Sequence, residues 1–130
     1  MQKIKFSFGW LALKLLGKSL YSNAWSAISE LVANGFDANA KNIYIYINMT
    51  NKSKSLIEII DDGIGLDENS INTYTIVGYN RRLEENSKVL NGYKVMGRKG
   101  IGKLAALYLS ERYFILSKTN AGVVNKWEMN

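Results

Sequence analysis

The chain has 130 residues, of which 47% are hydrophobic and 12% aromatic, enough to form one compact domain with an apolar core. It contains no cysteine and no histidine, which excludes disulfides, thiolate metal sites and a histidine general base. The net charge of +6 suggests an anionic partner. The apolar start, residues 6–16, is interrupted by Lys14 and lacks a cleavage site, and no run could span a membrane. We therefore expect a cytoplasmic location and no membrane partner.

The N-terminal third of the chain predicts two helices. Residues 11–20 are typical of a helix, and Ser22 or Asn23 can cap a second helix that runs from Ala24 to about Ala38. Gly35 inside this helix costs roughly 1 kcal/mol relative to alanine, which suggests a close approach at that turn.

Two hairpins and two short helices are predicted in the remainder. Isoleucine and tyrosine alternate over residues 43–47, which predicts a strand with one face on a core, and residues 56–60 predict a buried partner strand. The later elements are a short helix capped by Asp67 that runs through Val77, a long polar segment over 78–99, a helix over 101–109, and strands over 113–117 and through 127. This order predicts an α+β fold, a two-layer α/β sandwich with a mainly antiparallel mixed sheet and helices on one face.

Oxygen ligands form a stripe on the second predicted helix. Glu30, Asn34 and Asp37 are spaced by four and three residues, so they share one side of the helix. Such a stripe can be an ordinary solvated face, but this one lacks any lysine or arginine and suits Mg²⁺ or a water molecule that must lose a proton. The opposite side carries four apolar residues that we expect in the core: Trp25, Ile28, Val32 and Phe36.

A first glycine motif follows the strand over 56–60. Asp61, Gly63 and Gly65 form a DxGxG pattern, in which a held and partly desolvated acid can accept a hydrogen bond from an amine. The glycines allow a flat ring or a phosphate to approach the backbone. An ordinary Asp-Gly turn is the alternative interpretation.

A second glycine motif precedes the helix over 101–109. Gly97, Gly100 and Gly102 form GxxGxG, where free backbone N–H groups and the helix dipole favour an anion. Between Gly78 and Lys103, seven basic residues against two acidic ones leave +5 of the net charge. A flexible hinge or a basic nucleic-acid-binding module are the alternatives for this region.

The same segment also fits a different nucleotide-binding pattern. Gly97 to Lys103 satisfies GxxxxGK, the phosphate loop of another ATPase class. Against a phosphate-loop nucleotidase, Leu104 stands where a serine or threonine should bind magnesium, and the acidic strand precedes the loop instead of following it.

Taken together and in order, the segments 30–38, 61–65 and 97–103 resemble the three motifs of the Bergerat-fold ATPases, the GHKL superfamily. The resemblance covers about Ser22 to Glu128. The run from Asp37 to Asn42, followed by a strand, is more similar to the chaperone, MutL and MORC branches than to the histidine kinases.

The resemblance implies a role for each matching residue. Glu30 would be the general base, Asn34 would coordinate Mg²⁺, Asp37 would support the polar network, and Asp61 would accept from the adenine amino group. A lid over about 78–102 would wrap the phosphates, with Lys99 or Lys103 adding charge. The implied nucleotide-binding set comprises Asn34, Asp37, Ala38, Asp61, Gly63, Gly65, Gly97, Lys99, Gly100, Ile101, Gly102 and Lys103.

The resemblance also implies a wider setting. Residues 1–130 would be the ATP-binding domain at the N-terminal end of a longer protein, truncated before a further strand of the fold. Mg-ATP binding and slow hydrolysis to ADP would drive conformational change, with DNA or a client protein coupled through downstream domains and an ATP-dependent homodimer. The isolated piece is expected to bind nucleotide well and hydrolyse it poorly.

Overall fold

A computed structural model describes residues 9–76 and 102–129, and within these ranges the chain has the predicted α+β composition. The helices are α1 (Trp10–Leu20), α2 (Ala24–Asp37), α3 (Glu68–Thr75) and α5 (Ala105–Leu109), with 3₁₀ turns η1 (Lys52–Lys54) and η2 (Gly102–Leu104). The strands are β1 (Ile43–Asn48), β2 (Leu56–Asp61), β3 (Tyr113–Lys118) and β4 (Val124–Met129). In the described ranges, no helix combines the length and apolarity that a membrane crossing requires.

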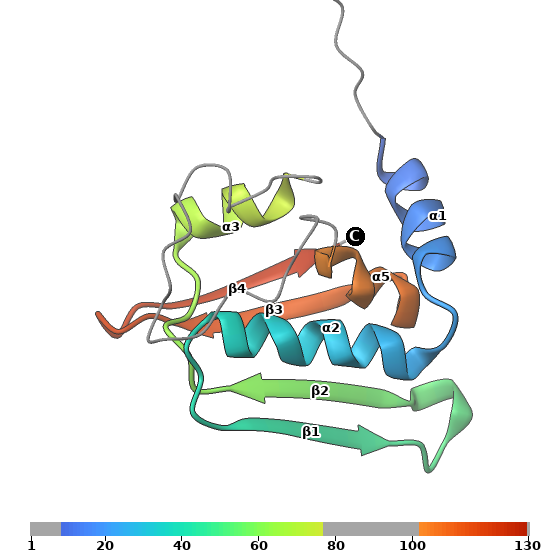
Figure 1. Cartoon of the computed structure of the whole chain (residues 1–130), viewed down its shortest axis with the longest axis horizontal. Coiled ribbons are helices and arrows are strands. Elements are labelled where there is room, and N and C mark those ends of the chain that lie inside the picture. The colour runs from blue at the N-terminus through green and yellow to red at the C-terminus, as the bar shows by residue number, and fades with distance from the viewer. Residues whose placement is uncertain (1–8, 77–101, 130) are drawn as a thin grey trace, which may run out of the picture.

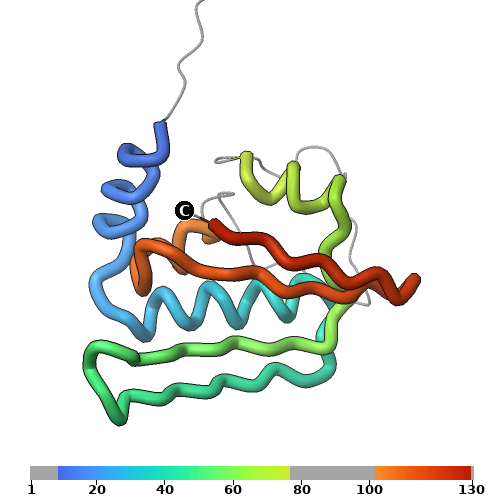
Figure 2. The backbone as a smooth tube through the Cα atoms, turned by 180° about the vertical axis from the view of Figure 1, so that it is seen from behind, coloured from blue at the N-terminus to red at the C-terminus, as the bar shows by residue number. Residues whose placement is uncertain are grey.

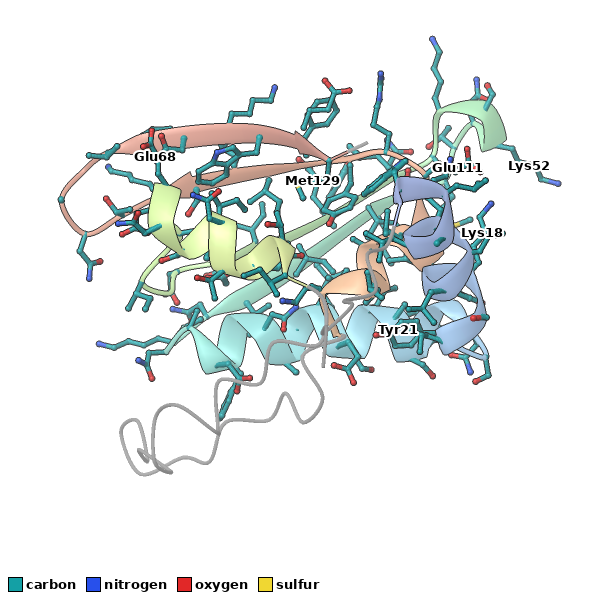
Figure 3. All side chains as sticks on the ribbon, turned by 90° about the horizontal axis from the view of Figure 1, so that it is seen from above. Lys18, Tyr21, Lys52, Glu68, Glu111 and Met129 are labelled. Atoms are coloured by element: carbon teal, nitrogen blue, oxygen red, sulfur yellow. The ribbon has the colours of Figure 1, made fainter. Side chains whose placement is uncertain are left out.

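The strands form two separate antiparallel hairpins, β1–β2 and β3–β4. Both hairpins were predicted, and each pairs antiparallel as a separate sheet within the described residues, whereas the sequence predicted one mainly antiparallel mixed sheet. Helix α2 packs against the β1–β2 hairpin, and in projection it is drawn between β2 and β3 (Figures 1 and 2). Seen from above, α2 and the β3–β4 hairpin form opposite sides of the molecule (Figure 3).

The core lies where α1, α2 and the η2–α5 segment meet. Small residues allow this close packing: a Cβ atom added to Gly17 of α1 would lie 2.8 Å from the Leu107 Cβ atom. On the surface beside this junction, the ammonium groups of Lys14 and Lys18 approach the carboxylate of Glu111 at 3.3 and 2.8 Å (Figure 3). The buried apolar residues are Ala27, Ile28, Ile71, Leu104, Ala105, Ala106 and Leu107.

The predicted apolar side of α2 is only partly buried: Ile28 is buried and Val32 half-buried, as predicted, but the two aromatic residues are not. Trp25 is 70% exposed and Phe36 is 39% exposed, whereas Ala27, Ile28 and Gly35 are buried. The apolar spacing was ambiguous because two sides of the helix carry apolar residues. The buried side is the one with small residues, which permit close approach of the neighbouring elements. The oxygen-bearing stripe therefore borders the core, and its three residues are half-buried.

The strands are also less buried than predicted. Ile45 and Ile47, expected on a core, are 46% and 39% exposed, and on β2 only Ile59 is not exposed. Alternation correctly indicated strands, but it could not indicate how much of each face would be covered.

The predicted caps are confirmed. The Asn23 side chain accepts a hydrogen bond from Ser26 N at 2.9 Å, and the Asp67 side chain accepts one from Ser70 N at 2.7 Å. The helix predicted over 101–109 consists of η2 and the shorter α5. After α2 the chain reverses through Asn39, which has a positive φ of 60°.

Candidate functional site

Helix α2 brings Glu30 against the second glycine motif. A Cβ atom added to Gly102, the first residue of η2, would lie only 2.7 Å from Oε2 of Glu30. Glycine thus lets the backbone at the start of η2 approach a carboxylate that any larger residue would displace. Two residues 72 positions apart in the sequence, predicted to share a site, are in close contact.

The C-terminal half of the same helix contacts the first glycine motif. A Cβ atom on Gly35 would lie 3.1 Å from the Asp61 Cβ atom, which confirms the close approach predicted at this turn. Ile64 N donates to the carbonyl oxygen of Ala38 at 2.9 Å, and a Cβ atom on Gly63 would lie 2.6 Å from that same oxygen. Asp61 Oδ1 accepts from Gly63 N at 2.9 Å, which orients the carboxylate.

Gly65 joins this loop to the other hairpin. It has a positive φ of 75°, and a Cβ atom there would collide with the carbonyl oxygen of Lys118 in β3. The neighbouring amide, Leu66 N, donates to Ser117 Oγ at 2.7 Å. Glycine is therefore required here both for its backbone conformation and for space.

Asp62 fixes the start of the β1 strand to this loop. Its carboxylate accepts from Lys41 N at 2.7 Å and from Asn42 N and Nδ2, both at 2.8 Å. The hydrogen bonds from Asn42, followed by that from Lys41, hold the pKa of Asp62 below its usual value. Both oxygens of Asp62 thus accept hydrogen bonds from residues 41 and 42. At the neighbouring Asp61, only Oδ1 accepts a hydrogen bond from the residues that the structure describes.

Four tyrosines interact in two pairs, and one of them, Tyr21, is affected by the charge of Glu30. The rings of Tyr21 and Tyr108 meet edge to face at 5.8 Å between centroids. Burial raises the pKa of Tyr21 to about 12, and the negative charge of Glu30 adds to the rise. Burial also raises the pKa of Tyr74 and, less strongly, that of Tyr113, whose hydroxyl interacts with that of Tyr74.

We expect these tyrosines to make the fold sensitive to alkali. Tyr21 ionises near pH 10 when unfolded but near pH 12 when folded, so its contribution to stability is complete below pH 10 and is lost as the pH rises towards 12. Tyr21→Phe should consequently lose less stability than the wild type across that window, as measured by urea-unfolding midpoints at pH 9 and pH 11. Equal losses in both proteins would contradict the assignment.

Lys103, the middle residue of η2, reaches back to the end of α3. Its Nζ atom donates to the carbonyl oxygen of Ile76 at 2.8 Å and lies 5.5 Å from the centroid of the Tyr74 ring. The side chain therefore joins the two ends of the described chain that flank residues 77–101.

Of the remaining predicted site residues, Asn34 and Asp37 are half-buried on α2, one and two turns beyond Glu30. Gly97, Lys99, Gly100 and Ile101, with most of the predicted lid, lie outside the described residues. We did not predict Asp62, Ser117 or the tyrosines as site residues. Ser117 had a signal, since it is a small polar residue on the inward-facing side of an otherwise apolar alternation.

Comparison with known proteins finds related sequences. The family described as "Histidine kinase-, DNA gyrase B-, and HSP90-like ATPase" matches residues 21–130. The chain is 38% identical over 102 residues to "Putative type II restriction enzyme HgiDII" of Herpetosiphon aurantiacus, covering 78% of this chain and 16% of that protein. It is 26% identical over 134 residues to the chaperone protein HtpG of Rhodopseudomonas palustris, covering 88% of this chain and 22% of the chaperone.

A further relative is the DNA mismatch repair protein MutL of Clostridium acetobutylicum, 38% identical over 58 residues, covering 45% of this chain and 9% of that protein. The chain thus spans about a fifth or less of the length of these relatives. The chaperone and MutL matches fit the branches predicted from the sequence. With the family match over 110 of its 130 residues and the three motifs in order, the chain belongs to the histidine kinase-, DNA gyrase B- and HSP90-like ATPase family.

Proposed function

We propose that this chain binds Mg-ATP and hydrolyses it slowly, with Glu30 as the general base. The observation that carries the proposal is that a single helix, α2, contacts both glycine motifs: Glu30 meets Gly102, and Gly35 meets Asp61. Membership of an ATPase family supports a nucleotide-related function in general.

Glu30 has the chemistry that the hydrolytic step requires. Its carboxylate would accept a proton from the attacking water and hold that water in line with the γ-phosphate. The chain has no histidine, so a carboxylate is the group available for this task near neutral pH. Gly102 leaves Glu30 unobstructed, since any side chain there would occupy the space of its Oε2 atom.

Asp61 would recognise the adenine amino group. Because Oδ1 already accepts from Gly63 N, the carboxylate is held in one orientation, and Oδ2 would accept from the exocyclic amine. Gly63 and Gly65, where added side chains would collide with backbone oxygens, would give the flat ring access to the loop.

The residues on α2 also fit magnesium. Asn34 and Glu30 offer hard oxygen donors of the kind that Mg²⁺ prefers, and the described residues hold no cluster of three acidic, histidine or cysteine side chains. This donor set suits an ion that takes most of its ligands from phosphates and water. When bound, the ion would neutralise charge on the phosphates, and Asn34 would hold it.

The phosphate-loop alternative fits the structure less well. That class places its loop between a strand and a helix in a βαβ unit, whereas the described strands pair only in antiparallel hairpins. The Lys103 ammonium, the indispensable group of that class, is bonded to the Ile76 carbonyl, and Leu104 is buried in the core.

The relatives are several times longer than this chain. The coupling of nucleotide hydrolysis to a biological task would therefore belong to the whole protein. HtpG is named a chaperone, MutL a mismatch-repair protein and HgiDII a restriction enzyme. We propose that nucleotide turnover here likewise drives conformational change in a larger protein, through an ATP-dependent homodimer that acts on DNA or on a client protein.

Calorimetric titration of the chain with ATP, ADP and GTP in magnesium buffer tests the nucleotide proposal. We expect adenine nucleotides to bind and GTP to bind at least about tenfold more weakly, since guanine presents a carbonyl oxygen where adenine has its amine. A parallel titration with duplex DNA at two salt concentrations tests the nucleic-acid module. Salt-sensitive DNA binding with no ATP binding would overturn the proposed function.

A further inference from the structure

Lys103 is held by two groups at the end of α3. Its Nζ atom donates to the Ile76 carbonyl oxygen at 2.8 Å and lies over the face of the Tyr74 ring, a cation–π arrangement. The Tyr74 hydroxyl in turn lies 3.5 Å from the carbonyl oxygen of Lys103 itself, a long contact that adds to the ring interaction. Side chain and backbone of Lys103 thus both meet α3.

The residues on either side of Lys103 show what this anchoring controls. Leu104 is 4% exposed and packs into the core between the helices. Gly102, on the other side of Lys103, has its backbone against the Glu30 carboxylate. A Cβ atom added to Gly102 would lie 2.7 Å from Glu30 Oε2. The position of Gly102 is therefore set by a core residue and by the tie from Lys103 to α3.

We propose that Lys103 is a positioning residue, which ties the end of α3 to the start of η2 and so holds the Gly102 backbone against the Glu30 carboxylate. Its effect on hydrolysis rests on the proposed function. This role differs from direct phosphate binding, because the ammonium acts through Ile76 and Tyr74 and not through the nucleotide.

Three variants separate positioning from phosphate binding: Lys103→Met, Lys103→Arg and the control Lys52→Met. Methionine keeps the apolar stem but removes the donor and the charge, whereas arginine keeps both and can still cover Tyr74. Lys52 lies in η1 at the far end of the β1–β2 hairpin, so its replacement removes the same charge elsewhere (Figure 3).

In the complete protein, Lys103→Met should lower kcat by about 10- to 100-fold, the size expected when a catalytic group is slightly displaced. ATP affinity should stay within about threefold of wild type, since no contact to the nucleotide is lost. Lys103→Arg should recover most of kcat, and Lys52→Met should change neither quantity. A Lys103→Met protein that loses ATP affinity more than about tenfold but keeps kcat at saturation would identify a phosphate ligand and overturn the proposal.

A second readout does not depend on nucleotide. The carboxyl ¹³C chemical shift of Glu30, measured by NMR at one fixed pH, should move in Lys103→Met and in Gly102→Ala and return towards wild type in Lys103→Arg. The double variant with Lys103→Met and Gly102→Ala should lower kcat by less than the product of the two single fold-losses, because both substitutions act through one contact. If wild type binds no ATP, the proposed function fails, yet an unchanged Glu30 shift in Lys103→Met would still overturn the positioning role independently.

Discussion

Replacing Glu30 with glutamine is expected to lower the rate of ATP hydrolysis by about 10²- to 10⁴-fold, the usual contribution of a general base. Glutamine has nearly the same shape, so its side-chain oxygen can stay beside Gly102 and continue to orient a water molecule, but it cannot take the proton. Phosphate release at saturating ATP in the complete protein measures the loss, and calorimetry should show nucleotide affinity almost unchanged.

Glu58→Gln is the matched control for that experiment. Glu58 lies in β2 opposite Tyr46, on the face of the hairpin turned away from the face that Ile43 and Asp61 share next to α2, and it is exposed. Its replacement removes the same charge and should leave the rate unaltered. Hydrolysis at the wild-type rate in Glu30→Gln would exclude Glu30 as the base.

Asp61→Asn should weaken ATP binding by roughly 10- to 100-fold, equivalent to a charged hydrogen bond of about 1.5–3 kcal/mol. The amide oxygen can still accept from Gly63 N at the position of Oδ1, so the loop should remain in place. The other carboxylate oxygen becomes an NH₂ group, which would oppose the adenine amine donor to donor. Calorimetric titration with ATP measures the effect, and circular dichroism checks the fold.

Asp62→Asn provides the neighbouring comparison. The Asp62 carboxylate accepts hydrogen bonds from Lys41 and Asn42. In the variant, the new side-chain NH₂ group would face the Asn42 side-chain NH₂ group, which should lower the stability of the fold. Nucleotide affinity should remain near wild type. If the two variants exchanged behaviours, with affinity lost at position 62 and kept at position 61, the adenine role would pass to Asp62.

The helices, hairpins and caps could be predicted from the sequence because they depend on local periodicity and on residues a few positions apart. The side chains of Asn23 and Asp67 cap their helices by accepting a hydrogen bond from the backbone amide three residues later, so the local sequence is enough to predict the interaction. The glycines were informative for a related reason: Gly63 permits a backbone approach that a Cβ atom would block, and Gly35 and Gly102 lie against the side chains of Asp61 and Glu30.

What could not be predicted depends on contacts distant in sequence. Ser117 bonds to Leu66 across 51 positions, and Lys103 bonds to Ile76 across 27, so the local sequence identifies neither partner. Burial was also misjudged: Trp25 is exposed because the packed side of α2 follows Ala27 and Gly35, which admit neighbouring elements, and not the largest apolar side chains. Large apolar side chains were taken to mark the buried side of the helix, whereas close packing of neighbouring elements requires small residues there.

The left-handed turn at Asn39 limits how far this part of the chain can drift in evolution. With φ at 60°, the position accepts glycine, asparagine or aspartate readily and disfavours β-branched residues strongly. The turn sends the chain from the Ala38 carbonyl, which anchors Ile64, back towards β1. A valine or isoleucine at position 39 would thus disturb the adenine end of the proposed site from a residue that touches no nucleotide.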